Sequence, residues 1–430
     1  MIRPIAAALA FLLAPVCVTA QEAKPPTEAA SDILKERAED VAAVLRGEKQ
    51  AEAVFAPAFL AAVPATQLSA IGEQLAAQFG AFVGVERVEA SSRYQGTIYL
   101  RFEKAIGSGN LALLPDEPNM VGGLLLQSFE PIDDNADKIA ADLAALPGEV
   151  SVLFGPLADG AEPIMSINPD AQLALGSTFK LYVLSALARS IENGERNWND
   201  VVELNVKSFP SGRLQSWPEG SPLTLQSLAS LMISVSDNTA TDQLIRVLGR
   251  EAIEAEAAQI GHSDPAGLMP FLTTLELFAL KADKDLGTRF AEGDEAEQRA
   301  VLDELRALTG WTTDNISGPT FVEPTMIDTL EWFANTGDIA KLMDTLARYE
   351  DQTVRDVMAI NPSMPKAIRE RWAYIGYKGG SEPGVLNLSW LLFDKNNAAH
   401  VLTMSWSNSE AGLDNSTFEL LAQRIVALAE

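Results

Sequence analysis

A lysine near the start of an apolar segment most constrains what this chain can form. Residues 175–180 read LGSTFK, and the next twelve, LYVLSALARSIE, are almost all apolar or good helix formers, which predicts a buried helix. A charged lysine inside such a helix is costly unless a partner or neutralisation compensates for its burial. On a helix, Ser177 and Lys180 would share one face. The stretch therefore indicates either a serine with a lysine as its base, or a capping serine beside a surface lysine.

A second polar group interrupts the segment TLQSLASLMISVSDNTATDQLIRVLG. Its pattern predicts a helix capped by Thr224, a break at Ser-Asp-Asn (residues 236–238), and a further helix that ends at Gly249. One interpretation is a plain helix–helix connection whose aspartate caps the second helix. The other is that Ser236 and Asn238 point into a shared cleft.

A third group lies in the predicted strand RWAYIGYKGGSE. Two glycines weaken a strand and usually indicate that another group approaches its backbone closely. Lys378 on one face of this strand, with the backbone of Gly380 and the free N–H of Ser381, could bind a substrate carboxylate and complete an oxyanion hole. Taken alone, the same residues also fit a β-bulge.

The order of the apolar patterns predicts two domains. Residues 31–80 have helical periodicity, with Ser31 as a helix cap and Gly80 as a stop, and residues 81–129 alternate like three or four antiparallel strands. They predict a small α+β domain at 31–130. Residues 134–430 begin with a helix and a hairpin and end with three strands and a helix. This order predicts one antiparallel sheet formed by both ends of the domain, beside a helical lobe.

The first twenty residues have the pattern of a secretory signal, with Arg3, a short apolar run and a small residue, Ala20, at the expected cut. That run is too short to span a membrane. The sequence therefore predicts an exported protein that is soluble after cleavage and resides in a bacterial periplasm. The only cysteine, Cys17, lies in this segment, so no disulfide or cysteine-bound metal is expected in the mature chain.

The charge and the scarcity of histidine exclude several functions. A net charge of −27 argues against nucleic-acid binding and against stable association with anionic membranes. The two histidines, His262 and His400, are too few for a zinc site built on several histidines. They are interpreted as a surface and a strand histidine. A hydrolase of this sequence would therefore use a base other than histidine.

In their order along the chain, S-x-x-K, S-D-N and K-G-G resemble the signature of serine β-lactamases and penicillin-binding proteins. The interval from Ser177 to Ser236 and the sequence SVSDNTATDQLI are typical of class A β-lactamases, and the resemblance covers roughly residues 134–430. The preceding order of helices and strands resembles the steroid-isomerase-like cone, in which a curved sheet wraps a helix.

The resemblance implies a role for each matched residue. Ser177 would be the acylated nucleophile, Lys180 its general base, and Ser236 the relay of a proton to the leaving group. The remaining roles concern binding: Asn238 would hold the substrate's amide side chain, Lys378 would support its carboxylate, and the N–H groups of Ser177 and Ser381 would form the oxyanion hole. No metal or organic cofactor is implied, and the expected partner is a small β-lactam, ester or peptidoglycan-like substrate. Trp217, in a Pro-, Gly- and Ser-rich loop, either lines this pocket or simply packs.

Two departures from the family pattern affect the expected activity. Gly379 lacks the hydroxyl that usually follows the lysine of the third motif, although Ser381 could partly substitute for it. The E-x-x-L-N motif, whose glutamate activates the deacylating water in class A enzymes, is absent between residues 239 and 377. The nearest candidate, Glu276, is interpreted as an ordinary helical glutamate. We therefore expect an acyl-enzyme that forms but hydrolyses slowly, and thus a weak β-lactamase.

Two other functions remain open at this point. One is a peptidase or esterase similar to penicillin-binding proteins, which acts on cell-wall fragments. The other is a catalytically silent protein that binds muropeptides or β-lactams.

Overall fold

The computed structural model describes residues 31–132, 134–158, 160–310, 312–314 and 321–429. The predicted secretory signal lies outside these residues. The chain divides into two compact units, Met1–Ile132 and Asp133–Glu430, and each is described by itself. None of the described helices is long and apolar enough to cross a membrane.

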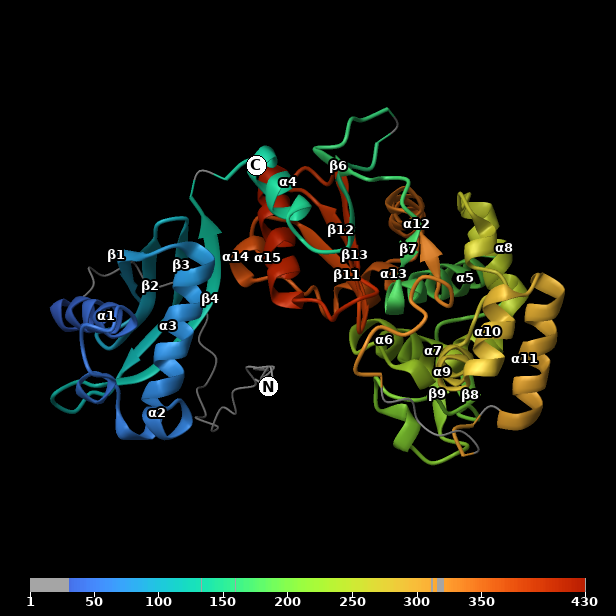
Figure 1. The fold of residues 1–430 in the computed structure, drawn as a ribbon, viewed down its shortest axis with the longest axis horizontal. Helices are drawn as coiled ribbons and strands as arrows, with labels where there is room; N and C mark the ends of the chain where they lie inside the picture. Colours follow the sequence, from blue (N-terminus) through green and yellow to red (C-terminus); the bar gives the residue numbers. More distant parts are fainter. Residues whose placement is uncertain (1–30, 133, 159, 311, 315–320, 430) are drawn as a thin grey trace. The chain divides into compact units, whose positions relative to one another are not determined.

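In the described part of the first unit, from residue 31 on, three α-helices precede a four-stranded antiparallel sheet with the strand order β1-β2-β3-β4. This is the predicted order of elements, and α1 lies against β1 and β2 (Figure 1). Ser31 caps α1 as expected, because its side chain accepts a hydrogen bond from Leu34 N at 3.2 Å. The resemblance to the steroid-isomerase cone stays a prediction. The elements are α1 (Asp32–Leu45), α2 (Pro57–Ala62), α3 (Ala65–Phe79), β1 (Phe82–Ala90), β2 (Gln95–Phe102), β3 (Ala105–Leu113) and β4 (Val121–Pro131).

The second unit contains a five-stranded antiparallel sheet to which both of its ends contribute, as the sequence predicts. The strand order is β11-β12-β13-β5-β6, so that β11 is an edge strand. The three C-terminal strands pair with one another in sequence order, and the last of them, β13, pairs with β5 of the hairpin formed by β5 and β6. The strands are β5 (Glu149–Pro156), β6 (Met165–Ile167), β11 (Tyr374–Glu382), β12 (Val385–Phe393) and β13 (Ala399–Ser407).

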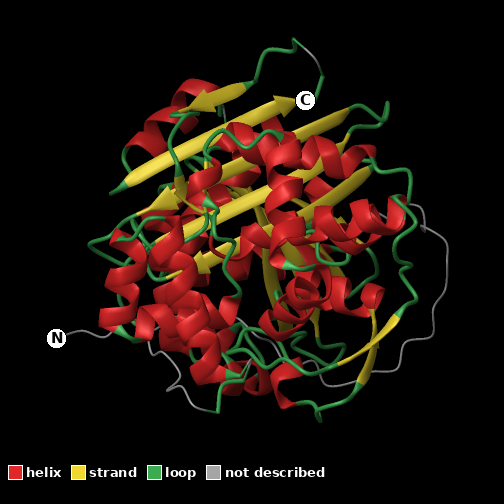
Figure 2. Cartoon of the chain, turned by 90° about the vertical axis from the view of Figure 1, so that its right-hand side faces the viewer, coloured by secondary structure: helices red, strands yellow, loops and turns green. Residues whose placement is uncertain are grey.

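Helices cover both faces of this sheet (Figure 2). On one face, α4 (Ala136–Ala144) and α15 (Asn415–Val426) form an apolar core with the strands. On the other face, α12 (Thr336–Arg348) crosses β12, β13 and β5. Strand β12 is consequently buried from Val385 to Leu392, which is why its sequence is almost continuously apolar.

The helical lobe forms the wall of the candidate active site that lies opposite the sheet. Thr224 caps α6 through a bond from Ser227 N at 3.1 Å, and α7 ends at Gly249, as predicted. One interpretation was wrong: His262 is buried, 3.8 Å from a carboxylate oxygen of Asp338, rather than at the surface. The lobe and its connections comprise α5 (Lys180–Glu192), α6 (Leu225–Ser234), α7 (Asn238–Leu248), α8 (Arg250–Ile260), α9 (Thr274–Ala282), α10 (Lys284–Glu292), α11 (Glu295–Thr309), α13 (Thr353–Ala359), α14 (Lys366–Arg369), and the short pairs β7 (Leu173–Ala174) with β10 (Phe333–Ala334) and β8 (Val201–Glu203) with β9 (Pro222–Thr224).

Replacement of Phe418 by alanine tests the packing of α15 on the sheet. Its ring is fully buried and lies 5.5 Å from the ring of Trp406, so Phe418→Ala should lower the free energy of unfolding by about 3–5 kcal/mol. All seven tryptophans lie after residue 133, so their fluorescence in urea reports the unfolding of this unit. Ser416→Ala, at an exposed position of the same helix, should change the free energy by less than about 0.5 kcal/mol. Equal effects of the two replacements would contradict this packing.

Candidate active site

Ser177 lies on a single 3-10 turn, η2 (Gly176–Phe179), placed directly before α5. The sequence predicted that the α-helix would begin at the serine, but α5 begins at Lys180. The turn is held on one side by Phe179, whose ring is buried and stacks on Trp332 with 3.6 Å between the ring centroids. The serine itself is half-buried and faces a cavity.

Lys180 is fully buried and hydrogen-bonded to the Ser-Asp-Asn segment. Its Nζ donates to Ser236 O at 2.7 Å, to Ser236 Oγ at 3.0 Å and to Asn238 Oδ1 at 2.6 Å. Burial, and secondly the charge of Lys378, hold the pKa of Lys180 well below its usual range. A lysine with a lowered pKa is neutral, and can accept a proton, at a lower pH than an exposed lysine.

The Ser-Asp-Asn segment satisfies both interpretations of its sequence. Asp237 caps α7 by accepting from Ala240 N at 2.9 Å, and its other oxygen accepts from Arg213 N and Leu214 N at 2.6 and 3.0 Å. This buried carboxylate fixes the connection, while Ser236 and Asn238 on either side of it face the cavity. The helix–helix connection is therefore also a wall of the site.

Lys378 completes a polar chain around Ser236. Its Nζ donates to Ser236 Oγ at 3.1 Å and to the carbonyl of Gly379. Ser236 Oγ thus lies between the amines of Lys180 and Lys378. Burial lowers the pKa of Lys378 to about 7, so this site does not require two charged lysines at neutral pH.

Two glycines allow β11 to contact the turn that carries Ser177. A β-carbon on Gly380 would lie 2.1 Å from Leu175 O and 2.3 Å from Ser177 N. On the opposite side of the contact, a β-carbon on Gly176, which has a φ of +48°, would lie 3.0 Å from Ser381 N. Any larger residue at 380 would push the strand away. The backbone N–H groups of Ser177 and Ser381 are therefore brought to the same end of the cavity.

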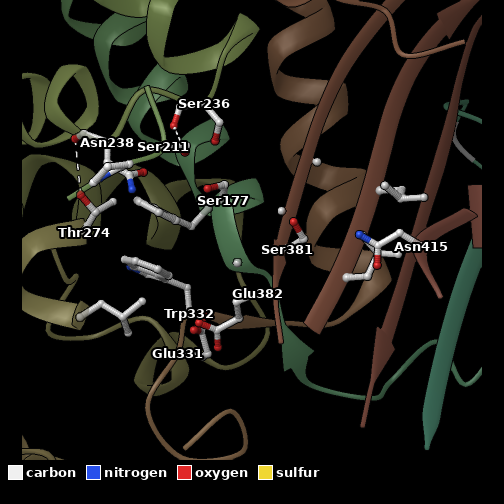
Figure 3. A pocket seen from close by; sticks show the side chains of 18 of the residues that line it. Ser177, Ser211, Ser236, Asn238, Thr274, Glu331, Trp332, Ser381, Glu382 and Asn415 are labelled. Carbon is white, nitrogen blue, oxygen red and sulfur yellow. Dashed lines mark hydrogen bonds between the residues drawn. The ribbon is translucent and has the colours of Figure 1, made fainter. Parts of the chain in front are cut away.

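The cavity has a volume of about 470 Å³ and lies between β11 and the helical lobe (Figure 3). Among the residues expected from the sequence, its lining includes Ser177, Ser236, Asn238, Gly380 and Ser381. Trp217 is not in the lining, and 44% of its surface is exposed.

Glu276 also lies outside the lining. It forms the capping box of α9 with Thr273 and an ion pair with Arg250 at 2.6 Å. This arrangement fits its interpretation as a structural glutamate. Among the described residues, no group of three His, Cys, Asp or Glu side chains could hold a metal ion.

Among the residues of the cavity wall that sequence reasoning missed are Glu331, Trp332 and Glu382. Glu382 lies two residues after the third motif, and strand alternation would have placed its side chain on the same face as Lys378. Glu331 and Trp332 carry no such signal, because they lie in a segment between helices.

A single methyl group added at Gly380 tests the contact between β11 and η2. Because the new carbon would meet only backbone atoms, Gly380→Ala should displace the strand and lower the rate at which an activated ester labels Ser177 by about 100-fold. Gly412→Ala is the matched control, since nothing lies within 4 Å of its added carbon, and it should label at the unaltered rate. An unaltered rate in Gly380→Ala, measured by intact mass spectrometry, would refute the contact.

The second unit is similar to several known proteins. Residues 134–301 match the β-lactamase enzyme family. Among solved structures, a β-lactamase from Sphaerobacter thermophilus is 23% identical, with 69% of this chain and 97% of that chain covered and a TM-score of 0.48. A β-lactamase from Chitinophaga pinensis is 14% identical (68% and 97% covered, TM-score 0.45), and the protein PBP-A is 16% identical (68% and 93% covered, TM-score 0.46). No curated protein matches the sequence. The match to the β-lactamase enzyme family thus falls within the second unit, over residues 134–301.

Proposed function

We propose that the second unit is a serine hydrolase that forms an acyl intermediate on Ser177 with a β-lactam, an ester or a related amide. The observation that carries this proposal is the buried amine of Lys180, one turn after Ser177 and bound to Ser236 and Asn238. A serine hydroxyl is a poor nucleophile unless a neighbouring group takes its proton. A lysine whose pKa burial has lowered is suited to that task.

Acylation would begin with attack of Ser177 Oγ on the substrate's carbonyl carbon, while its proton passes to Lys180 Nζ. The negative charge that develops on the carbonyl oxygen would be stabilised by the N–H groups of Ser177 and Ser381. Such preorganised donors stabilise a transition state more than they stabilise the substrate. The glycines at 176 and 380 contribute by letting these two backbone segments meet.

The leaving group would receive its proton through Ser236. Its hydroxyl is within hydrogen-bond distance of both Lys180 and Lys378, so a proton taken by Lys180 can pass along this chain to the departing nitrogen or oxygen. Lys378, with a pKa lowered to about 7 by burial, would also support a substrate carboxylate when protonated.

Asn238 would have two tasks. Its Oδ1 accepts from Lys180 at 2.6 Å, and its Nδ2 donates to Phe209 O at 3.1 Å. An amide oxygen has a second lone pair and an amide nitrogen a second N–H. Asn238 can therefore position the lysine and still bind an amide side chain of the substrate.

Export to a periplasm is a further part of this proposal and is supported by the pattern of the first twenty residues.

One observation favours slow release of the acyl group, as in a penicillin-binding protein or a weak β-lactamase. Glu276, the nearest glutamate to fit the sequence expectation for a water-activating base, is engaged with Arg250 and lies outside the cavity lining. Deacylation therefore depends on a different group or remains slow.

Intact mass spectrometry with a chromogenic cephalosporin and a reporter ester tests the acyl intermediate. One acyl group should appear on the wild type and none on Ser177→Ala, and Lys180→Met should acylate about 10²–10⁴-fold more slowly, because it lacks the base. Ser416→Ala, at an exposed serine far along the sequence, should behave like the wild type. Turnover of the cephalosporin and the ester that persists in Ser177→Ala would refute the proposal. Turnover of the ester alone would favour the esterase, and a lasting adduct without turnover would favour the silent binder.

A further inference from the structure

A second cluster of titratable groups lines the same cavity and has no part in the chemistry described so far. Lys281 Nζ donates to Glu331 Oε1 at 2.7 Å and is also hydrogen-bonded to the carboxylate of Glu382. The side chains of Lys281 and Glu331 are fully buried, whereas that of Glu382 is 13% exposed. Both glutamates belong to the cavity lining, and Figure 3 shows their carboxyl groups side by side, next to Trp332.

The alternation of β11 places this cluster on the side of Ser177 opposite to Lys378. Residues 378, 380 and 382 share one face of the strand, because side chains of a strand alternate with a period of two. Gly380, in the middle of the three, lies against the backbone of Ser177. Ser177 is therefore flanked along the strand by the two-lysine chain on one side and by the glutamate pair on the other.

The carboxyl groups of Glu331 and Glu382 lack one hydrogen-bond donor. Two carboxyl groups share a single lysine, and Oε2 of Glu331 is buried without a hydrogen-bond partner among the described residues. Burial, and secondly the charge of Glu331, raise the pKa of Glu382 to about 9, since two buried carboxylates this close cannot both ionise cheaply. At neutral pH the pair consequently holds one proton, which Glu382 can donate to the unpartnered oxygen of Glu331.

We propose that the Glu331–Glu382 pair accepts the proton of the water that hydrolyses the acyl-Ser177 ester. The inference rests on the proposed function, because it requires that ester to form. Both glutamates line the cavity, but the side chain of Glu382 is partly exposed whereas that of Glu331 is fully buried. The pair thus acts as a two-step relay between the cavity and a protected carboxylate.

In this step the water oxygen bonds to the acyl carbon and one of its protons passes to Glu382, which hands its own proton to Oε2 of Glu331. The tetrahedral intermediate then collapses, the bond between the acyl carbon and Ser177 Oγ breaks, and the pair returns one proton to Oγ. The products are the free carboxylic acid and the serine hydroxyl. Lys281 keeps its positive charge throughout and limits the repulsion within the pair.

A purely structural role makes a different prediction. If the cluster only held the end of β11 in place, its loss would misplace Ser381 N–H, and acylation and deacylation would slow together. A proton acceptor for water is needed in the second step alone. Separate measurement of the two rates therefore distinguishes the two roles.

The test uses the full chain and the variants Glu382→Gln and Glu331→Gln, with a chromogenic ester, stopped-flow absorbance and intact mass spectrometry. Acylation of Glu382→Gln should stay within about threefold of the wild-type rate, while deacylation should fall by about 10²–10⁴-fold, the usual contribution of a general base. The acyl adduct should then persist. Glu276→Gln is the matched control: glutamine preserves its capping box, its ion pair lies outside the cavity lining, and its adduct should decay at the wild-type rate.

Each other outcome overturns the inference. The inference fails if the Glu382→Gln adduct decays like that of the wild type. It also fails if both rates fall equally, or if the wild-type adduct never decays. Glu331→Gln buries a new amide and is checked by circular dichroism. If Glu331→Gln fails to fold, the result for Glu382→Gln, at the more exposed position, decides between the two roles. A wild type that forms no adduct at all would instead refute the acyl intermediate, and this inference with it.

Discussion

The burial of the Lys180 amine is the constraint on which the rest of the site depends. A lysine with no exposed surface is tolerated only where it is neutral or fully hydrogen-bonded. Here Ser236 and Asn238, where α6 gives way to α7, accept three hydrogen bonds from its amine. That connection is rigid because Asp237 caps α7 and also binds the backbone of residues 213 and 214. The same amine therefore joins the helix after Ser177 to a second pair of helices, and its burial lowers its pKa.

The second requirement is the contact of β11 with the turn before α5. A sheet edge and a helical lobe would normally be separated by side chains, but Gly176 and Gly380 remove them at one point. Lys378 and Glu382, two residues to either side of Gly380, then lie on opposite sides of it along one strand. In the proposed function, this arrangement would serve two proton transfers in succession, the first through the lysine chain to form the ester and the second through the carboxyl pair to hydrolyse it.

The sequence predicts those residues of the site that belong to short motifs or helix caps. Three motifs identify Ser177, Lys180, Ser236 and Lys378, and caps such as Thr224 locate helix starts to within a residue, because each depends on neighbours a few positions away. The cluster around Lys281 has no such signal, since that lysine is 50 residues from Glu331 and 101 from Glu382 in sequence. The 3-10 turn at Ser177 was also missed, because its shape is imposed by β11 and Trp332 rather than by its own residues. The same limit applies to Trp217, whose loop sequence does not specify which surface it faces.

The most direct test of the account is an NMR titration of the amines of Lys180 and Lys378 in protein labelled at lysine, with Lys180→Met and Lys378→Met to assign the signals. Burial should place the pKa of Lys378 near 7 and that of Lys180 well below the ordinary lysine value. Both amines would then lose their protons as the pH rises through a range in which exposed lysines stay charged. A Lys180 that titrates near the ordinary value of about 10.4 would be a cation at neutral pH, could not take the proton of Ser177, and would contradict the account.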